Sequence, residues 1–308
     1  MREPIWLATG ILWTFELHAL EAAAAALGIG AVCLLRQLLR IELPAALVLG
    51  VLAATVFALS GAAPALFRKS RGDKSPRRPV SFRRAFYLVS PHFAYGSFYY
   101  LFLFSDRLLA WSARAGRAAP FVQFRGDYEM GLGLGLAAFI VLVGWVRAST
   151  AHFDRRRQEA QKSFTIFRLA EFDSLLAGHY YKWAACFLPA AAAVSAAIYC
   201  TARLLGMFSN PAAERVALWA LAGFPLVVLG LRNVSLLFSL ARPLPALAAI
   251  ILAWLADIGA GYALLQIGSY EHAVIGFTLG AAIFAGVSGY CLVHTIHRLD
   301  YYYFASAA

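Results

Sequence analysis

The sequence predicts an all-α, polytopic membrane protein with about eight transmembrane helices. Of the 308 residues, 61% are hydrophobic and only 14% are charged, whereas soluble domains are about 45–50% apolar and about 25% charged. The apolar residues form several runs of about 20 residues, the length that crosses a bilayer as a helix. The net charge of +11 is concentrated in two segments between such runs, which favours membrane topology over nucleic-acid binding.

Eight apolar runs are long enough to be spans. They lie at residues 19–38, 44–66, 90–111, 128–147, 181–206, 213–236, 244–267 and 272–295. A ninth apolar segment, residues 5–16, is shorter and is typical of the end of a longer helix. We therefore divide the chain into N-terminal spans at 1–66, a basic linker at 67–84, and a six-helix bundle at 85–308.

The basic segments predict the orientation of the chain. Residues 67–84 contain eight Lys or Arg and one acid, and residues 147–182 contain seven more basic residues. By the positive-inside rule both segments face the cytoplasm. The short links near 39–43, 112–127, 207–212 and 268–271 then face the other side of the membrane. With eight spans, both termini are expected to be cytoplasmic.

The second basic segment, near 150–178, has a mixed apolar and basic pattern. Its apolar residues are Phe153, Phe164, Phe167, Phe172 and Leu175, and its basic residues include Arg155, Arg156, Arg157, Lys162 and Arg168. This pattern is typical of a helix that lies on the inner leaflet with its basic side towards anionic lipid headgroups. The same charges could bind a cytoplasmic partner, and a plain solvated linker is the alternative.

The third span carries the most informative polar residues. Ser90 and Pro91 are typical of a helix start, because serine caps helices and proline suits the first turn. Helical spacing then places five residues on one stripe: His92, Tyr95, Tyr99, Phe102 and Asp106. Arg107 lies about 100° away from that stripe. It is therefore expected to snorkel outward or to bind a group other than Asp106.

A buried acid in a span needs a reason, because an ionised group costs at least about 2.5–3.5 kcal/mol at the centre of a membrane helix. Asp106 is expected to face the protein interior or a cavity, where tyrosine faces and a carboxylate suit a polar substrate. A structural Asp paired to another helix is the alternative. Asp257, midway along the seventh span, has the same two interpretations. We expect Arg232 to snorkel, and the glycines at 131–135 to allow close helix packing.

Other chemistry is not indicated by the sequence. His294 and His297 have a spacing that can bind a metal, but no third ligand lies nearby in sequence. No HExxH, P-loop or Ser-His-Asp pattern is present. We therefore predict no metal, no cofactor and no enzyme activity.

A resemblance to a known family is carried by the sequence YGSFYYLFLFSDRLLAW. It resembles the seventh helix of the Pel exopolysaccharide transporter family (PelG-type), where a Tyr/Phe-rich span leads to an Asp-Lys or Asp-Arg pair and then a Trp. The stretch DYEMGLGLGLAAFIVLVGWVRASTAHFDRRRQEAQKSF is similar to the following helix and its charged segment. The N-terminal GILWTFELHALEAAAAALGIG resembles the end of the fourth helix and the start of the fifth. The resemblance thus runs from about the fourth helix of the family to its C-terminus.

This resemblance implies membership of the MATE/Wzx-like flippase superfamily, whose members have two six-helix bundles around a cavity. The chain would be a shortened homologue, one part of a split gene or a sequence with an incomplete start, in the bacterial inner membrane. It would move a glycan polymer outward, beside a cytoplasmic glycosyltransferase and other membrane subunits. The pathway residues would be Asp106, Arg107, Tyr95, Tyr99, His92 and Asp257. The alternatives are a non-transporting scaffold subunit of a synthesis complex, and a flippase for lipid-linked oligosaccharides or small molecules.

Overall fold

In the computed structural model the chain divides into two compact units, Met1–Pro79 and Val80–Ala308. The structure describes residues 82–113, 125–163, 169–208 and 210–298, together with scattered helical positions between 23 and 61, of which 52–58 are the longest continuous run. The segment at 5–16 and the termini lie outside the described residues. So do most of the expected spans at 19–38 and 44–66 and most of the basic linker at 67–84.

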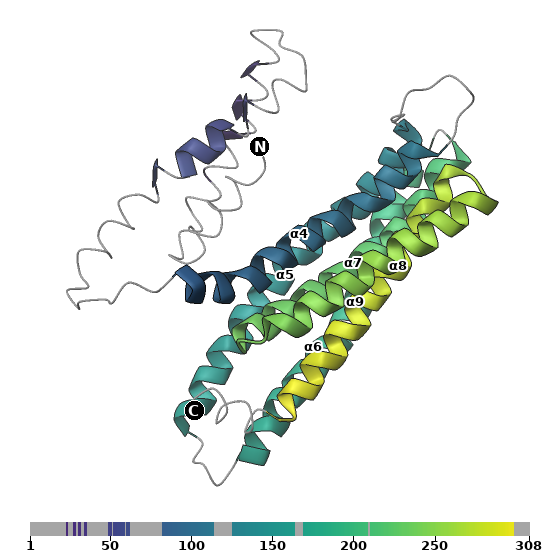
Figure 1. The fold of residues 1–308 in the computed structure, drawn as a ribbon. Helices are drawn as coiled ribbons and strands as arrows, with labels where there is room; N and C mark the ends of the chain where they lie inside the picture. The colour runs from purple at the N-terminus through teal and green to yellow at the C-terminus, as the bar shows by residue number, and fades with distance from the viewer. Residues whose placement is uncertain are drawn as a thin grey trace. The chain divides into compact units, whose positions relative to one another are not determined.

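Every regular element described in the second unit is a helix (Figure 1), which confirms the predicted all-helical class. The elements are α4 (Phe82–Ser112), α5 (Gly126–Ser163), α6 (Leu169–Leu204), α7 (Pro211–Ser239), α8 (Pro243–Ile267), the short 3₁₀-helix η2 (Tyr270–His272) and α9 (Ala273–Ile296). The start of α7 shows how local sequence sets these bounds. The Asn210 side chain accepts a hydrogen bond from the Ala212 N–H at 3.1 Å, and Pro211 occupies the first turn.

Five stretches of the described residues are long and apolar enough to cross a membrane. They are Gly126–Thr150, Asp173–Leu204, Pro211–Ser239, Pro243–Ile267 and Tyr270–Ile296. Four of them contain the spans expected at 128–147, 213–236, 244–267 and 272–295, and the second overlaps the span expected at 181–206. Large apolar side chains are exposed along these helices, among them Ile140, Val141, Leu188, Leu255 and Leu279. Exposed apolar side chains on such long helices are typical of a membrane protein.

The span expected at 90–111 lies within α4, but α4 is not one of these five stretches. Its several tyrosines and serines, with Asp106 and Arg107, make it more polar than its neighbours. The expected number of about eight spans therefore stays a prediction.

The prediction that this helix begins at Ser90 and Pro91 is wrong, because α4 begins at Phe82 and Pro91 lies inside it. A proline cannot donate a hydrogen bond to the carbonyl four residues earlier, which here belongs to Tyr87. The Ser90 hydroxyl donates to that same carbonyl at 3.4 Å. The serine thus supplies the bond that the proline removes, and the helix continues through it.

The helices pack in an order that differs from their order in the chain. α7 packs against α5 and α9, α9 packs against α8, and α8 packs against α4. Aromatic rings fill the core between them. The ring of Phe277 on α9 lies 5.3 Å from Phe102 on α4 and 5.0 Å from Phe224 on α7, measured between ring centroids. By contrast, α6 lies at the edge of the bundle and buries few side chains.

Glycines on α5 allow it to approach α7 closely, as the sequence predicts. A Cβ added to Gly131 would lie 2.6 Å from the Ala213 carbonyl oxygen, and one added to Gly135 would lie 2.7 Å from the Ala220 Cβ. Gly133, between them, has open space around it. Positions 131 and 135 are one helical turn apart, so they share the face that contacts α7.

Polar contacts join the helices at one end of the bundle. The Asn210 amide donates to Asp127 at 3.0 Å, and the Arg215 guanidinium donates twice to Glu271, at 3.0 and 2.8 Å. These residues belong to or adjoin the links expected at 112–127, 207–212 and 268–271. The described residues of these three links therefore lie at the same end of the bundle, which we call the link end.

Candidate functional site

The α4 stripe that helical spacing predicts faces the interior of the bundle over most of its length. Its members differ in exposure: Tyr95, Phe102 and Asp106 are buried, Tyr99 is half-buried and His92 is exposed. The Tyr95 ring meets Phe238 of α7 edge-on at 5.1 Å, and Phe102 stacks on Phe277. These two rings thus pack against neighbouring helices, and the stripe leads along this packed surface to Asp106.

Asp106 is fully buried and is held from α5. The Tyr128 hydroxyl donates a hydrogen bond to its Oδ2 atom at 2.8 Å. Its Oδ1 atom has no hydrogen-bond partner in the described part of the chain. The expectation that Asp106 faces the protein interior is confirmed.

Arg107 binds a second group, as its position off the stripe suggests. Its Nε atom donates to Glu129 at 3.2 Å, and its Nη1 atom donates to the Leu103 carbonyl at 3.0 Å. The Trp111 indole N–H donates to the other Glu129 oxygen at 3.2 Å. Glu129 therefore connects the end of α4 to α5. Sequence reasoning missed Glu129, although an acidic residue at the start of the next span could have suggested a partner for Arg107.

Asp257 is also fully buried, and it is held from α4. The Ser105 hydroxyl donates to its Oδ2 atom at 2.5 Å, and its Oδ1 atom has no hydrogen-bond partner among the described residues. The backbone of α9 passes close by. A Cβ on Gly276 would lie 2.6 Å from the Asp257 carbonyl oxygen, and a Cβ on Gly280 would lie 3.1 Å from the Asp257 Cβ.

The structure thus gathers Ser105, Asp106, Tyr128 and Asp257 from α4, α5 and α8, and we call them the acid cluster. Both carboxylates are fully buried, and each has one oxygen with no hydrogen-bond partner among the described residues. A buried pair of this kind attracts a cation or a proton, and its free oxygens can accept hydrogen bonds from hydroxyl groups. No group of three or more His, Cys, Asp or Glu that could hold a metal lies together in the described residues.

A polar pocket of about 550 Å³ lies at the link end, between the ends of α4 and α8. Its polar and aromatic lining residues are Ser112, Arg125, Tyr262, Gln266, Ser269 and Tyr270. Leu109 also lines it, one helical turn beyond Asp106 on α4. A Cβ on Gly261 of α8 would lie 2.9 Å from Leu109 Cδ1, so this leucine packs on α8 between the acid cluster and the pocket.

Arg232 lies buried within the bundle, so the prediction that it snorkels is wrong. Its side chain has no exposed surface. Its guanidinium lies 3.6 Å from the Trp183 ring centroid and 5.4 Å from that of Tyr180, and its Nε atom donates to Ser149 at 3.2 Å. Desolvated cation–π contacts contribute about 2 kcal/mol, whereas burying a charge costs several kcal/mol. The side chain is covered because α5 and α6 both pack over this part of α7.

Asn233, the next residue, is buried in a hydrogen-bonded network. Its amide donates to the Ala285 carbonyl at 3.3 Å and to the Ser288 hydroxyl at 3.2 Å. Its Oδ1 atom accepts from the Tyr180 hydroxyl at 3.0 Å. This network connects α6, α7 and α9. An asparagine inside a span was its only signal in the sequence.

The described residues of the basic segment near 150–178 belong to two long helices, and their place on the inner leaflet stays a prediction. Residues up to Ser163 continue α5, and α6 begins at Leu169. Phe153 is fully buried, and its ring lies 5.9 Å from that of His179 on α6. This apolar residue therefore packs helix against helix instead of against lipid. Arg155 and Arg156 are exposed, whereas the side chains of Arg157 and Lys162 lie outside the described residues.

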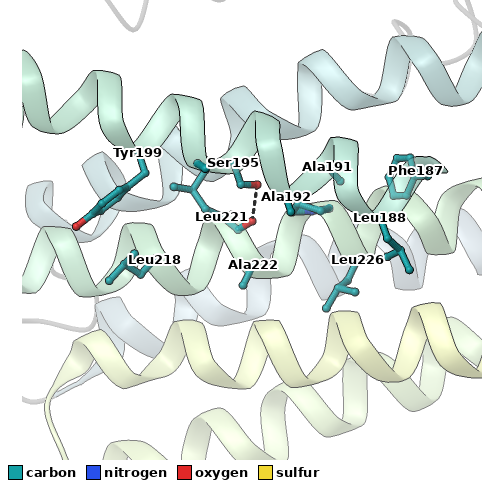
Figure 2. Close-up of a pocket in the computed structure, with 12 residues that line it drawn as sticks. Phe187, Leu188, Ala191, Ala192, Ser195, Tyr199, Leu218, Leu221, Ala222 and Leu226 are labelled. Atoms are coloured by element: carbon teal, nitrogen blue, oxygen red, sulfur yellow. Dashed lines mark hydrogen bonds between the residues drawn. The ribbon is translucent and has the colours of Figure 1, made fainter. Parts of the chain in front are cut away.

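A second pocket, of about 410 Å³, lies between α6 and α7 (Figure 2). Its lining is almost entirely apolar, with residues such as Phe187, Leu188, Leu218 and Leu226. The Ser195 hydroxyl crosses from α6 to donate to the Leu221 carbonyl on α7 at 2.9 Å, as the dashed line in Figure 2 shows. None of the predicted pathway residues lines either of these two pockets.

Fold and site together define a helical membrane protein with two acids buried between its helices. A scan against protein-family models, a search of curated proteins and a search of solved structures found no match.

Proposed function

We propose that this chain is an inner-membrane component of polysaccharide export, and that a glycan passes along the interface of α4 and α8. One observation carries the proposal: the buried acid cluster lies about one helical turn from a polar, tyrosine-lined pocket at the link end. On the predicted topology, the link end faces outward. A glycan that crosses the membrane must leave through such an end.

The residue types at the two places suit a glycan. Tyr262, Tyr270 and Gln266 in the pocket combine ring faces with hydrogen-bonding groups, which match the apolar faces and hydroxyls of sugars. The acid cluster adds negative charge, which favours a polymer that carries amino groups. Passage requires the helices to separate, because the acid cluster is closed in this conformation. Rigid-body rocking of helix bundles is the usual means of alternating access.

The substitution Asp106→Asn tests this proposal. It keeps the size of the side chain but removes its negative charge, so secreted polysaccharide should fall several-fold while membrane abundance stays unchanged. Asp127→Asn, at the link end, is the matched control, because Asp127 lies outside the acid cluster and contacts Asn210. Both would be expressed in a host that lacks its own copy of the gene. Secretion would be measured by a carbohydrate assay and abundance by immunoblot.

Two results of that experiment would count against the proposal. Normal secretion by Asp106→Asn would remove the acid cluster from any pathway. A parallel loss of protein and secretion would support the structural role that is the alternative for this residue.

A non-transporting scaffold subunit is the second candidate, favoured by the length of α5. The apolar stretch of α5 ends at Thr150, but the helix continues to Ser163 and exposes Arg155 and Arg156. Such a basic helical extension is suited to a cytoplasmic glycosyltransferase. If the chain is a scaffold, neutralising Arg155, Arg156 and Arg157 should release that partner in a pull-down and reduce polymer synthesis. An unchanged pull-down would argue against this candidate.

A further inference from the structure

The most unusual buried charge outside the acid cluster belongs to Arg232. We propose that Arg232, His152, Arg156, His179 and Lys182 form a binding site for a phosphate group, between α5 and α6 at the end of the bundle opposite the link end. This site is separate from the proposed glycan pathway, and it does not depend on the identity of the transported molecule.

The geometry of Arg232 is that of a guanidinium prepared for an anion. Its face is held by the Trp183 ring at 3.6 Å, and its Nε atom is used by Ser149. Both Nη atoms are buried and have no hydrogen-bond partner in the described part of the chain. The two free Nη atoms form one edge of a fixed planar group. This edge can donate two parallel hydrogen bonds, which is the bidentate geometry that phosphate accepts.

Further basic groups surround this side chain. The His152 ring on α5 lies 5.4 Å from the His179 ring on α6, measured between centroids. His179 precedes Tyr180 and Lys182 precedes Trp183, the two aromatic residues whose rings face Arg232. Arg156 lies one helical turn beyond His152 on α5. Arg156 and Lys182 are exposed, whereas Arg232 is fully buried. Positive charge thus extends from the surface of the bundle to its interior, so an anion is attracted at the rim and held at Arg232.

The depth of the site favours a lipid headgroup as the source of the phosphate. Ser149, which contacts Arg232, is one residue before the end of the apolar stretch Gly126–Thr150. On α5 the site therefore lies near the end of the apolar stretch, where headgroups are expected, while Arg232 reaches it from within the apolar stretch of α7. On the predicted topology these headgroups belong to the cytoplasmic leaflet, whose anionic lipids attract basic groups. A free phosphate or a phosphorylated solute offers the same chemistry, so the experiment must separate the two sources.

Native mass spectrometry of the purified full chain tests the site. The protein in detergent would receive equal amounts of phosphatidylglycerol and of diacylglycerol, which has no phosphate, with the same acyl chains. Wild type should retain phosphatidylglycerol about tenfold better, the factor that a charge-assisted hydrogen bond supplies. Arg232→Gln should abolish this preference. Arg203→Gln, which removes the same charge from an exposed residue at the link end, should keep it.

Two additional arms keep the result decisive. Arg156→Gln combined with Lys182→Gln alters only exposed residues, so it should weaken the preference without impairing folding, even if Arg232→Gln fails to fold. Millimolar inorganic phosphate should leave the bound lipid in place if the headgroup and its chains are recognised together. Displacement by phosphate would instead assign the site to free phosphate or a phosphorylated solute.

The proposal is overturned by either of two outcomes. One is equal retention of both lipids by wild type, with no retention of inorganic phosphate. The other is that the variants keep the preference for phosphatidylglycerol that wild type shows. This applies to Arg156→Gln combined with Lys182→Gln, and to Arg232→Gln where it folds.

Discussion

Among the described residues, the Asp106 carboxylate receives one side-chain hydrogen bond, from Tyr128, and this bond can be removed without changing the packing of the tyrosine ring. Tyr128→Phe leaves a buried acid with no described side-chain partner. Because a buried polar group without its partner costs about 1–3 kcal/mol, we expect a clear fall in the Tm of the purified protein in detergent. Tyr290→Phe is the control, because that tyrosine is exposed. Equal Tm values for the two variants would show that Tyr128 does not hold Asp106.

Single residues were predictable where helical geometry alone decides their direction. The 100° separation of Asp106 from Arg107 is a property of one helix, and their different partners follow from it. The identity of the Arg107 partner was not predictable, because Glu129 meets α4 only through the pairing of two helices. Arg232 was mispredicted for a related reason. Snorkelling assumes a helix beside lipid or water, and here α5 and α6 cover the arginine.

At the scale of helices, α5 and α7 are held together by two glycines one turn apart. Gly131→Ala should destabilise the bundle by about 1–3 kcal/mol, the usual cost of overpacking, because the added Cβ would meet backbone atoms of Ala213 and Ala217. Gly133→Ala should be neutral or stabilising, because its Cβ enters open space and alanine favours a helix. Thermal unfolding followed by circular dichroism measures both. A reversed order of stability would contradict this packing.

The course of the helices was predictable from apolar runs, but their ends were not. Apolar length correctly places four spans, and it misplaces the start of α4 because the Ser90 hydroxyl compensates for Pro91. It also does not show that α5 continues past Thr150, since that part is held by the contact of Phe153 with α6. Local sequence sets a helix end only where no other helix covers it.

At the scale of the whole molecule, the link end and the end that carries α5 residue Glu159 should lie on opposite sides of the membrane. Single cysteines at Leu205 and Glu159, in a background with the native cysteines replaced by alanine, test this. Both positions are exposed. A membrane-impermeant maleimide should label Leu205→Cys in intact cells and Glu159→Cys only after lysis. Labelling of both in intact cells would contradict the predicted topology.

The arrangement of the whole bundle was the least predictable level. The sequence indicates neighbours along the chain, yet α7 packs against α5 and α9, and α8 packs against α4. The acid cluster exists only because of that arrangement, since Asp257 reaches Ser105 across 152 positions of sequence. A candidate acid could therefore be named from sequence, whereas its partner could not.

The burial of Arg232 also has a consequence for biogenesis. A ribosome synthesises α5 and α6 before α7, so Ser149, Tyr180 and Trp183 are already in the membrane when Arg232 leaves the translocon. The aromatic faces on α6 then receive a charge that would oppose insertion of α7 on its own. We therefore expect the hairpin that precedes α7 to assist its insertion. A shortened chain that lacks this hairpin should leave α7 poorly inserted, although α7 itself is unchanged.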